Sequence, residues 1–114
     1  MAEGCLFCRI AAGELDARIV HQDDQVVAFE DLNPQAPTHV LVIPREHVAR
    51  AIEVTAAQGP VLARMFEVAG KVARDRGLED GYRLVVNNGP GAGQTVFHLH
   101  LHLLGGRGMK WPPG

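Results

Sequence analysis

Three histidines alternate near the C-terminal end of the chain, at positions 98, 100 and 102, and the 114-residue sequence has six histidines in all. Near neutral pH an imidazole can act as a nucleophile, a proton donor or a metal ligand. From the residues alone, this alternation allows two interpretations. The histidines either hold zinc on one face of a strand, or one of them attacks a substrate while its neighbours assist.

A glycine-rich segment comes directly before these histidines. Residues 89–95 read Gly-Pro-Gly-Ala-Gly-Gln-Thr, and bare backbone N–H groups of this kind are a usual means of holding a phosphate. A phosphate held beside a histidine favours phosphoryl or nucleotidyl transfer over a metal site.

Two cysteines, Cys5 and Cys8, form a C-x2-C pair near the N-terminus. In a reducing compartment this spacing indicates a metal site or a redox pair before a structural disulfide.

The overall composition excludes several classes of partner. The formal net charge is −2 and 46% of residues are hydrophobic, which is typical of a globular domain. There is no basic run to bind a nucleic acid, and no apolar stretch near the ~20 residues of a membrane helix. The N-terminus is unlike a signal peptide. We therefore expect a cytoplasmic protein with no nucleic-acid or membrane partner.

The hydrophobic pattern predicts the elements that must position these side chains. The expected helices cover residues 5–12 and 60–76, and the expected strands cover residues 19–22, 26–31, 39–43, 82–87 and 96–104. Apolar residues at spacings of three and four define the long helix, and hairpin signals favour antiparallel pairing. The fold class is therefore α+β: one domain over residues 1–114, with an antiparallel sheet of about five strands, one long helix and one short N-terminal helix.

The last expected strand reads Phe-His-Leu-His-Leu-His-Leu-Leu at residues 97–104. Successive side chains of a strand point to opposite faces. We therefore expect the three histidines to share one face, and Phe97, Leu99, Leu101 and Leu103 to share the core face.

These motifs together resemble the histidine triad family over essentially the whole chain. The matching segments are residues 31–39 (Asp-Leu-Asn-Pro-Gln-Ala-Pro-Thr-His), 42–44 (Val-Ile-Pro), 85–87 (Val-Val-Asn), the alternating histidines, and 104–106 (Leu-Gly-Gly). The Trp-Pro-Pro-Gly ending at 111–114 is similar to the nucleotide-binding, phosphoramidase branch of that family.

The resemblance implies a homodimeric, purine nucleotide-binding hydrolase of the adenosine 5′-monophosphoramidase type. Such an enzyme cleaves adenosine phosphoramidates through a covalent nucleotidyl-histidine intermediate and releases AMP, with no cofactor for catalysis. The fold it implies is the same α+β domain.

The resemblance also assigns roles to residues. His100 matches the nucleophile, His102 the histidine that contacts phosphate or leaving group, and His39 a further histidine of the site, with His98 completing the catalytic group. The implied nucleotide contacts are Asp31 at the ribose, Leu32 at the base, and Asn87, Gly93, Gln94, Thr95, His100 and His102.

Some bacterial members of the family that share the C-x2-C pair hold a structural zinc. The positions that match its ligands are Cys5, Cys8, His47 and His98. A structural zinc needs four such ligands, and this one would tie the N-terminal segment to the sheet.

Three alternatives stay open at this point. The first is a non-catalytic nucleotide-binding protein that controls a partner. The second is a relative that acts on another bond, such as a dinucleoside polyphosphate hydrolase or a nucleotidyl transferase, although the presence of His102 favours hydrolysis. The third is a metalloenzyme with the three alternating histidines as zinc ligands.

Overall fold

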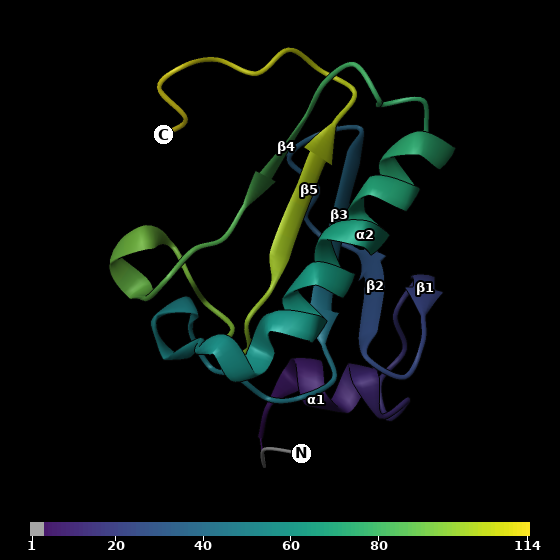
Figure 1. Ribbon diagram of the computed structural model, residues 1–114. Coiled ribbons are helices and arrows are strands. Elements are labelled where there is room, and N and C mark those ends of the chain that lie inside the picture. The colour runs from purple at the N-terminus through teal and green to yellow at the C-terminus, as the bar shows by residue number, and fades with distance from the viewer. Residues whose placement is uncertain (1–3) are drawn as a thin grey trace.

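A five-stranded antiparallel sheet carries the long helix on one face and the short helix toward the other in a computed structural model that describes residues 4–114 (Figure 1). In chain order the elements are α1 (Leu6–Ala11), β1 (Ile19–Gln22), β2 (Val26–Glu30), β3 (Thr38–Pro44), α2 (Gly59–Asp75), β4 (Tyr82–Val85) and β5 (Leu101–Gly105). Short 3-10 turns cover Ala51–Glu53, Ala56–Gln58 and Pro90–Ala92. The strand order is β1-β2-β3-β5-β4. The predicted α+β architecture is confirmed.

The central strand, β3, is buried along its whole length. It pairs antiparallel with β2 on one side and β5 on the other, so that Leu41 lies opposite both Phe29 and His102. A run of β-branched and apolar residues suits a strand that is covered on both faces.

Alternation along the strands divides the core into two layers. Val40 and Val42 of β3 face α2, where they join a cluster with Val68 and Leu103. Leu41 belongs to the other layer, which includes the α1 side chain of Phe7. His39 stands two residues before Leu41 on β3, and His102 lies directly opposite Leu41 on β5, so both side chains point to the same sheet face as Leu41. These two histidines therefore lie on the sheet face that α2 leaves uncovered.

The long helix α2 lies across the sheet, as Figure 1 shows. Pro60 occupies its first turn, where a missing N–H costs nothing. It ends before Gly77, whose φ of +71° closes the helix while the Leu78 N–H donates to the Ala73 carbonyl over 2.8 Å. The predicted span of 60–76 agrees to within one residue at each end. Phe66, an apolar residue of this helix, is 55% exposed.

The predicted strand over residues 96–104 is wrong in its first half. Strand β5 begins at Leu101, so His102 is in the sheet while His98 and His100 lie before it. Two features end the pairing there: β4 stops at Val85, and Pro44 at the end of β3 has no N–H to donate.

The same change of backbone affects the expected core face. Leu99, Leu101 and Leu103 are buried as predicted, but Phe97 is 44% exposed. The Leu99 N–H donates to the Val48 carbonyl over 2.6 Å instead of to a neighbouring strand.

None of the helices within residues 4–114 combines the length and the apolar character that crossing a membrane requires.

We predict that Leu103→Ala lowers the free energy of unfolding by about 2–5 kcal/mol, because a fully buried side chain leaves a cavity between the sheet and α2. The matched control is Leu32→Ala, since Leu32 is 95% exposed, and its expected change is within about 0.5 kcal/mol. Urea unfolding at saturating zinc measures both. Equal losses for the two variants would contradict the assigned core.

Candidate functional site

A cavity of about 240 Å³ lies on the sheet face opposite α2. Its apolar wall is formed by Leu6, Phe7 and Ile10 of α1, Phe29 and Leu41 of the sheet, Leu32 and Val96. Its polar lining is formed by Asp16, Glu30, Asp31, Thr95, His100 and His102. An apolar slot with a few polar groups along one side suits a small ligand with a flat apolar part and a charged part.

The α1 and β2 side chains of this wall were not among the expected site residues. The spacing of Leu6 and Ile10 indicates one helical face, but the sequence does not show whether that face meets the core or a cavity. Only the packing of α1 beside the segment that precedes β5 reveals it.

The nitrogen atoms of His100 are distinguished by a single hydrogen bond. Its Nδ1 lies 2.7 Å from the backbone carbonyl oxygen of His98. A carbonyl can only accept, so Nδ1 carries the proton and donates it. In the neutral ring the lone pair is then on Nε2. Since His100 lines the cavity, its geometry is that of an imidazole nucleophile.

His102 is oriented through His39. The backbone N–H of Gln35 donates to His39 Nδ1 over 3.0 Å, so the proton of the neutral His39 ring is on Nε2. That Nε2–H donates to His102 Nδ1 over 2.9 Å. The remaining proton of the neutral His102 ring is therefore on its own Nε2.

The Nε2–H group of His102 has no partner. It is the one buried side-chain polar atom without a hydrogen bond among the residues that the structure describes. An unsatisfied buried donor is costly. Because His102 lines the cavity beside His100, with ring centroids 4.9 Å apart, a ligand oxygen bound there would satisfy it.

Burial keeps these imidazoles neutral. It lowers the pKa of His100 below the usual range, against the opposing effects of the His98 carbonyl and the Asp31 charge. Burial, with the neighbouring His100 and His39, lowers the pKa of His102 to about 4. Burial also lowers the pKa of His39, against the charge of Asp31. All three rings are therefore neutral near pH 7, as a lone-pair nucleophile requires.

Asp31 is placed at the cavity by the turn that follows β2. One carboxylate oxygen, Oδ1, accepts from the Asn33 N–H over 2.8 Å, and the other, Oδ2, lies 3.4 Å from His39 Nε2. The carboxylate closes this turn and also lines the cavity with its neighbour Leu32.

The glycine-rich loop is held mainly by its own hydrogen bonds. The N–H of Gly93 donates to Pro90 and that of Gln94 to Gly89. The buried Gln94 side chain donates to the carbonyls of Ala49 and Val96 over 2.9 and 3.0 Å. Gln94 thus braces the loop in this structure.

The expected nucleotide contacts divide into two groups. Asp31, Leu32, Thr95, His100 and His102 line the cavity, whereas Asn87, Gly93 and Gln94 do not. Contacts from the second group to a nucleotide remain predictions, and Thr95 is the member of the 93–95 segment that lies at the cavity.

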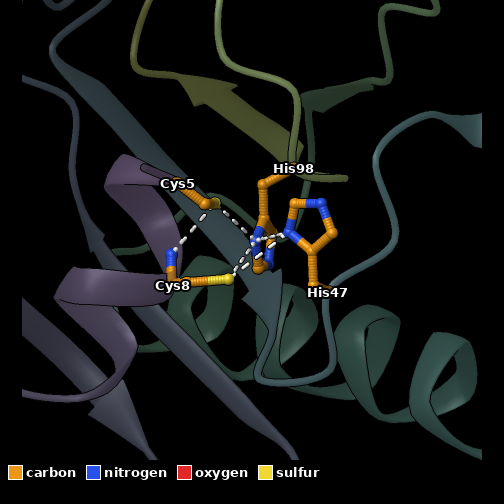
Figure 2. Close-up of side chains that lie close together, drawn as sticks. All are labelled: Cys5, Cys8, His47 and His98. Carbon is orange, nitrogen blue, oxygen red and sulfur yellow. Dashed lines mark hydrogen bonds between the residues drawn. The ribbon is translucent and has the colours of Figure 1, made fainter. Parts of the chain in front are cut away.

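A second cluster lies beside the cavity, where Cys5, Cys8, His47 and His98 converge as predicted (Figure 2). Its potential ligand atoms all lie within 4.8 Å of one another. His98 Nε2–H donates to the Pro44 carbonyl over 2.7 Å. Its Nδ1 lone pair therefore points into the cluster, 3.3 Å from Cys5 Sγ and 3.5 Å from Cys8 Sγ.

The donor set fits zinc. Zn–S bonds near 2.3 Å and Zn–N bonds near 2.0–2.1 Å in a tetrahedron separate a nitrogen from a sulfur ligand by roughly 3.5–3.6 Å, and two nitrogen ligands by roughly 3.3–3.4 Å. The nitrogen–sulfur distances of 3.3 to 3.5 Å come within about 0.3 Å of the tetrahedral value, and the 3.3 Å between His47 Nδ1 and His98 Nδ1 agrees with the nitrogen–nitrogen value. Two thiols and two imidazoles form a closed structural site with no position for a substrate, and the Pro44 carbonyl orients one ligand from behind.

The three alternating histidines do not converge on a single metal. His98 belongs to the Cys–His cluster, His102 lies with Asp31 and His39 in a separate group, and His100 is in neither. The His39 Nε2 that faces His102 carries a proton, so it has no lone pair for a metal there. The structure thus does not support the alternative in which the triad forms a catalytic zinc site.

Comparisons with known proteins agree with this geometry. A family model described as HIT domain matches residues 12–109. A purine nucleoside phosphoramidase of Escherichia coli is 48% identical over 108 residues, covering 94% of this chain and 91% of that protein. A 14 kDa zinc-binding protein of Zea mays is 45% identical over 111 residues, covering 96% and 87%. The crystal structure of a HIT family hydrolase from Legionella pneumophila superposes with a TM-score of 0.95 at 51% identity, covering 97% of this chain and 100% of that one.

We predict that protein purified without a chelator carries about one zinc per chain, because four ligand atoms are already placed for a tetrahedron. His47→Ala is expected to reduce the zinc content strongly, and His21→Ala, which changes a histidine bonded to Asp23 outside the cluster, is expected to retain it. Elemental analysis measures both. A wild-type content well under one zinc per chain would refute the site.

Proposed function

Because the chain belongs to the HIT domain family, we propose that it hydrolyses purine nucleoside phosphoramidates, typically those of adenosine, to the nucleoside monophosphate and an amine. The arrangement of His100 and His102 carries this proposal. His100 carries a lone pair on Nε2, His102 carries an unpartnered Nε2–H donor, and both side chains line the same cavity. The named activity of the Escherichia coli relative supports the same reaction.

The apolar slot between α1 and the sheet suits the purine. Phe7, Phe29 and Leu32 offer flat or branched apolar surfaces there. The carboxylate of Asp31 at the rim is a suitable acceptor for ribose hydroxyls. A base in this slot would place the α-phosphate toward the polar side, where His100, His102 and Thr95 lie.

In the first step, His100 Nε2 attacks the α-phosphorus. The bond from phosphorus to the substrate nitrogen breaks, and the departing amine takes up a proton from solvent. The His100 ring gains positive charge as the nucleotidyl group bonds to Nε2, and the His98 carbonyl stabilises that charge through Nδ1–H.

Charge on the phosphate oxygens is stabilised by His102. Its Nε2–H is held in place by the hydrogen bonds that run from Gln35 through His39, so little reorganisation is needed as the charge develops. In the second step water attacks the phosphorus, loses a proton to solvent, and releases the nucleoside monophosphate from His100.

We propose that zinc is structural and that the reaction needs no cofactor. Zinc at the Cys–His cluster would supply a fixed link between α1 and the segment that precedes β5. Every step above uses only groups of the chain, water and protons exchanged with solvent. The named zinc-binding relative supports occupancy of the cluster. A cytoplasmic location, and the absence of nucleic-acid or membrane partners, remain predictions.

We also propose a homodimer. Trp111 is 82% exposed on a tail with two prolines, and Phe66 projects from α2 into solvent. Exposed large apolar side chains of this kind indicate an interface, and a two-fold dimer would bury the copy of each side chain in both chains.

The proposed catalytic roles are tested by two substitutions. His100→Asn removes the attacking lone pair while keeping a polar side chain, so hydrolysis of an adenosine phosphoramidate should fall by several orders of magnitude while AMP binding survives. His102→Ala removes one charge-stabilising donor, and a loss of roughly 10²–10⁴-fold in rate is expected. Steady-state kinetics and calorimetric AMP binding measure these effects.

The matched control for these substitutions is His21→Asn, which alters a histidine on β1 that lies outside the cavity and should leave turnover unchanged. Near wild-type turnover in His100→Asn together with an inactive His102→Ala would reverse the assigned roles.

The pH dependence follows from the depressed pKa of His100. A base whose folded pKa is lowered stays neutral, and therefore active, as pH falls to the usual histidine range. We predict that kcat/KM changes little between about pH 8 and pH 6.5 and declines only below that range. If kcat/KM fell to half of its maximum at a pH above 6.5 on the acid side, His100 would have no lowered pKa and the prediction would be wrong.

Sedimentation equilibrium at micromolar concentration tests the homodimer, and the expected mass is that of two chains. Trp111→Ala should weaken the association because it removes the proposed anchor. A wild-type protein that sediments as one chain would contradict the proposed dimer.

A further inference from the structure

Helix α1 contributes residues to both the Cys–His cluster and the cavity. Cys5 is its N-cap residue, and the Cys5 sulfur accepts a hydrogen bond from the Cys8 N–H over 3.2 Å. Between these two cysteines stand Leu6 and Phe7, and both line the cavity. A single turn of helix therefore presents two metal ligands to one site and two apolar contacts to the other.

His98 joins the same two sites through different atoms. Its Nδ1 faces the thiols of Cys5 and Cys8. Its backbone carbonyl accepts the Nδ1–H of His100, the bond that leaves the His100 lone pair on Nε2. Any shift of His98 that follows from changes at the cluster would move that carbonyl.

The Phe7 ring provides a second contact between α1 and His100. It packs edge-on against His100 with ring centroids 5.1 Å apart, and against Phe29 at 5.3 Å. Phe7 is a buried residue of α1, so a shift of α1 would move its ring against His100 and Phe29.

Helix α1 packs on the sheet through Phe7 and Ile10, and polar contacts hold its two ends. It has six residues, too few to be stable in isolation. At its C-terminal end the Arg45 guanidinium donates to the Ala11 carbonyl over 2.7 Å. At its N-terminal end the metal cluster is the link to His47 and His98, as Figure 2 shows.

We infer that zinc at the Cys5–Cys8–His47–His98 cluster and a purine nucleotide in the cavity bind cooperatively, with Phe7 and His98 as the positioning residues that couple the two sites. This inference rests on the proposed function, since it takes the nucleotide as the cavity's ligand. Zinc fixes one wall of the cavity before the nucleotide arrives, so less ordering remains when the nucleotide binds. Linkage makes the effect reciprocal: bound nucleotide strengthens zinc binding by the same factor.

The test measures zinc affinity in a chelator buffer that fixes free zinc, with and without saturating AMP. We expect AMP to strengthen zinc binding by about tenfold, within the usual range of coupling between sites. A zinc affinity that AMP leaves unchanged overturns the inference. The measurement needs no turnover and starts from the zinc-loaded protein.

Two variants test the route of the coupling. Phe7→Leu keeps an apolar side chain but removes the ring that meets His100, and the AMP effect on zinc should shrink toward onefold. The control is Leu32→Ala, which alters the same cavity at a residue that belongs neither to α1 nor to the Cys–His cluster. This variant should weaken AMP binding. Once AMP is saturating, however, AMP should strengthen zinc binding by the same factor as in the wild type.

The outcomes separate the inference from the proposed function. Zinc-loaded protein that binds no AMP overturns the proposed function and the inference with it. Protein that binds AMP with an unchanged zinc affinity overturns the inference alone. Full coupling in Phe7→Leu overturns the part assigned to Phe7. If zinc-free protein unfolds, the rate of zinc loss from the loaded protein to excess chelator replaces the titration, and AMP should slow it.

Discussion

One hydrogen bond, from His100 Nδ1 to the His98 carbonyl, decides what the histidines of this protein can do. It puts the His100 lone pair on Nε2. The oxygen that accepts this bond belongs to His98, whose own side chain faces the thiols of Cys5 and Cys8. A second bond of the same kind, from His98 Nε2 to the Pro44 carbonyl, turns the other ring toward the cluster. Histidines two residues apart are thereby given different chemistry by two carbonyls, which can only accept.

Much of the scaffold could be predicted because its elements follow regular periods. The spacing of apolar residues in α2, with Pro60 and Gly77 at its ends, and the β-branched run of β3 leave few alternatives. The Cys5 and Cys8 pair could be joined to His47 and His98 only through the family resemblance, since nothing in their separation along the chain brings them together.

What could not be predicted depends on where the regular pairing stops. Period-two alternation continues through residues 97–100, but a strand also needs a partner, and the missing N–H of Pro44 and the end of β4 at Val85 remove it. Phe97 is exposed as a result. The role of Phe7 as a cavity wall was equally hidden, because helical spacing indicates a face and not what the face meets.

The most direct test of the account is whether a nucleotidyl group becomes attached to His100 during turnover. Protein mixed with an adenosine phosphoramidate and quenched within one turnover in alkaline denaturant, where a phosphorus–nitrogen bond to histidine survives, can be digested and mapped by mass spectrometry. The account predicts an adenylyl group on the peptide that contains His100, with fragmentation placing it on that ring. Amine release with the group on His98 or His102, or with no adduct on any residue, would contradict it.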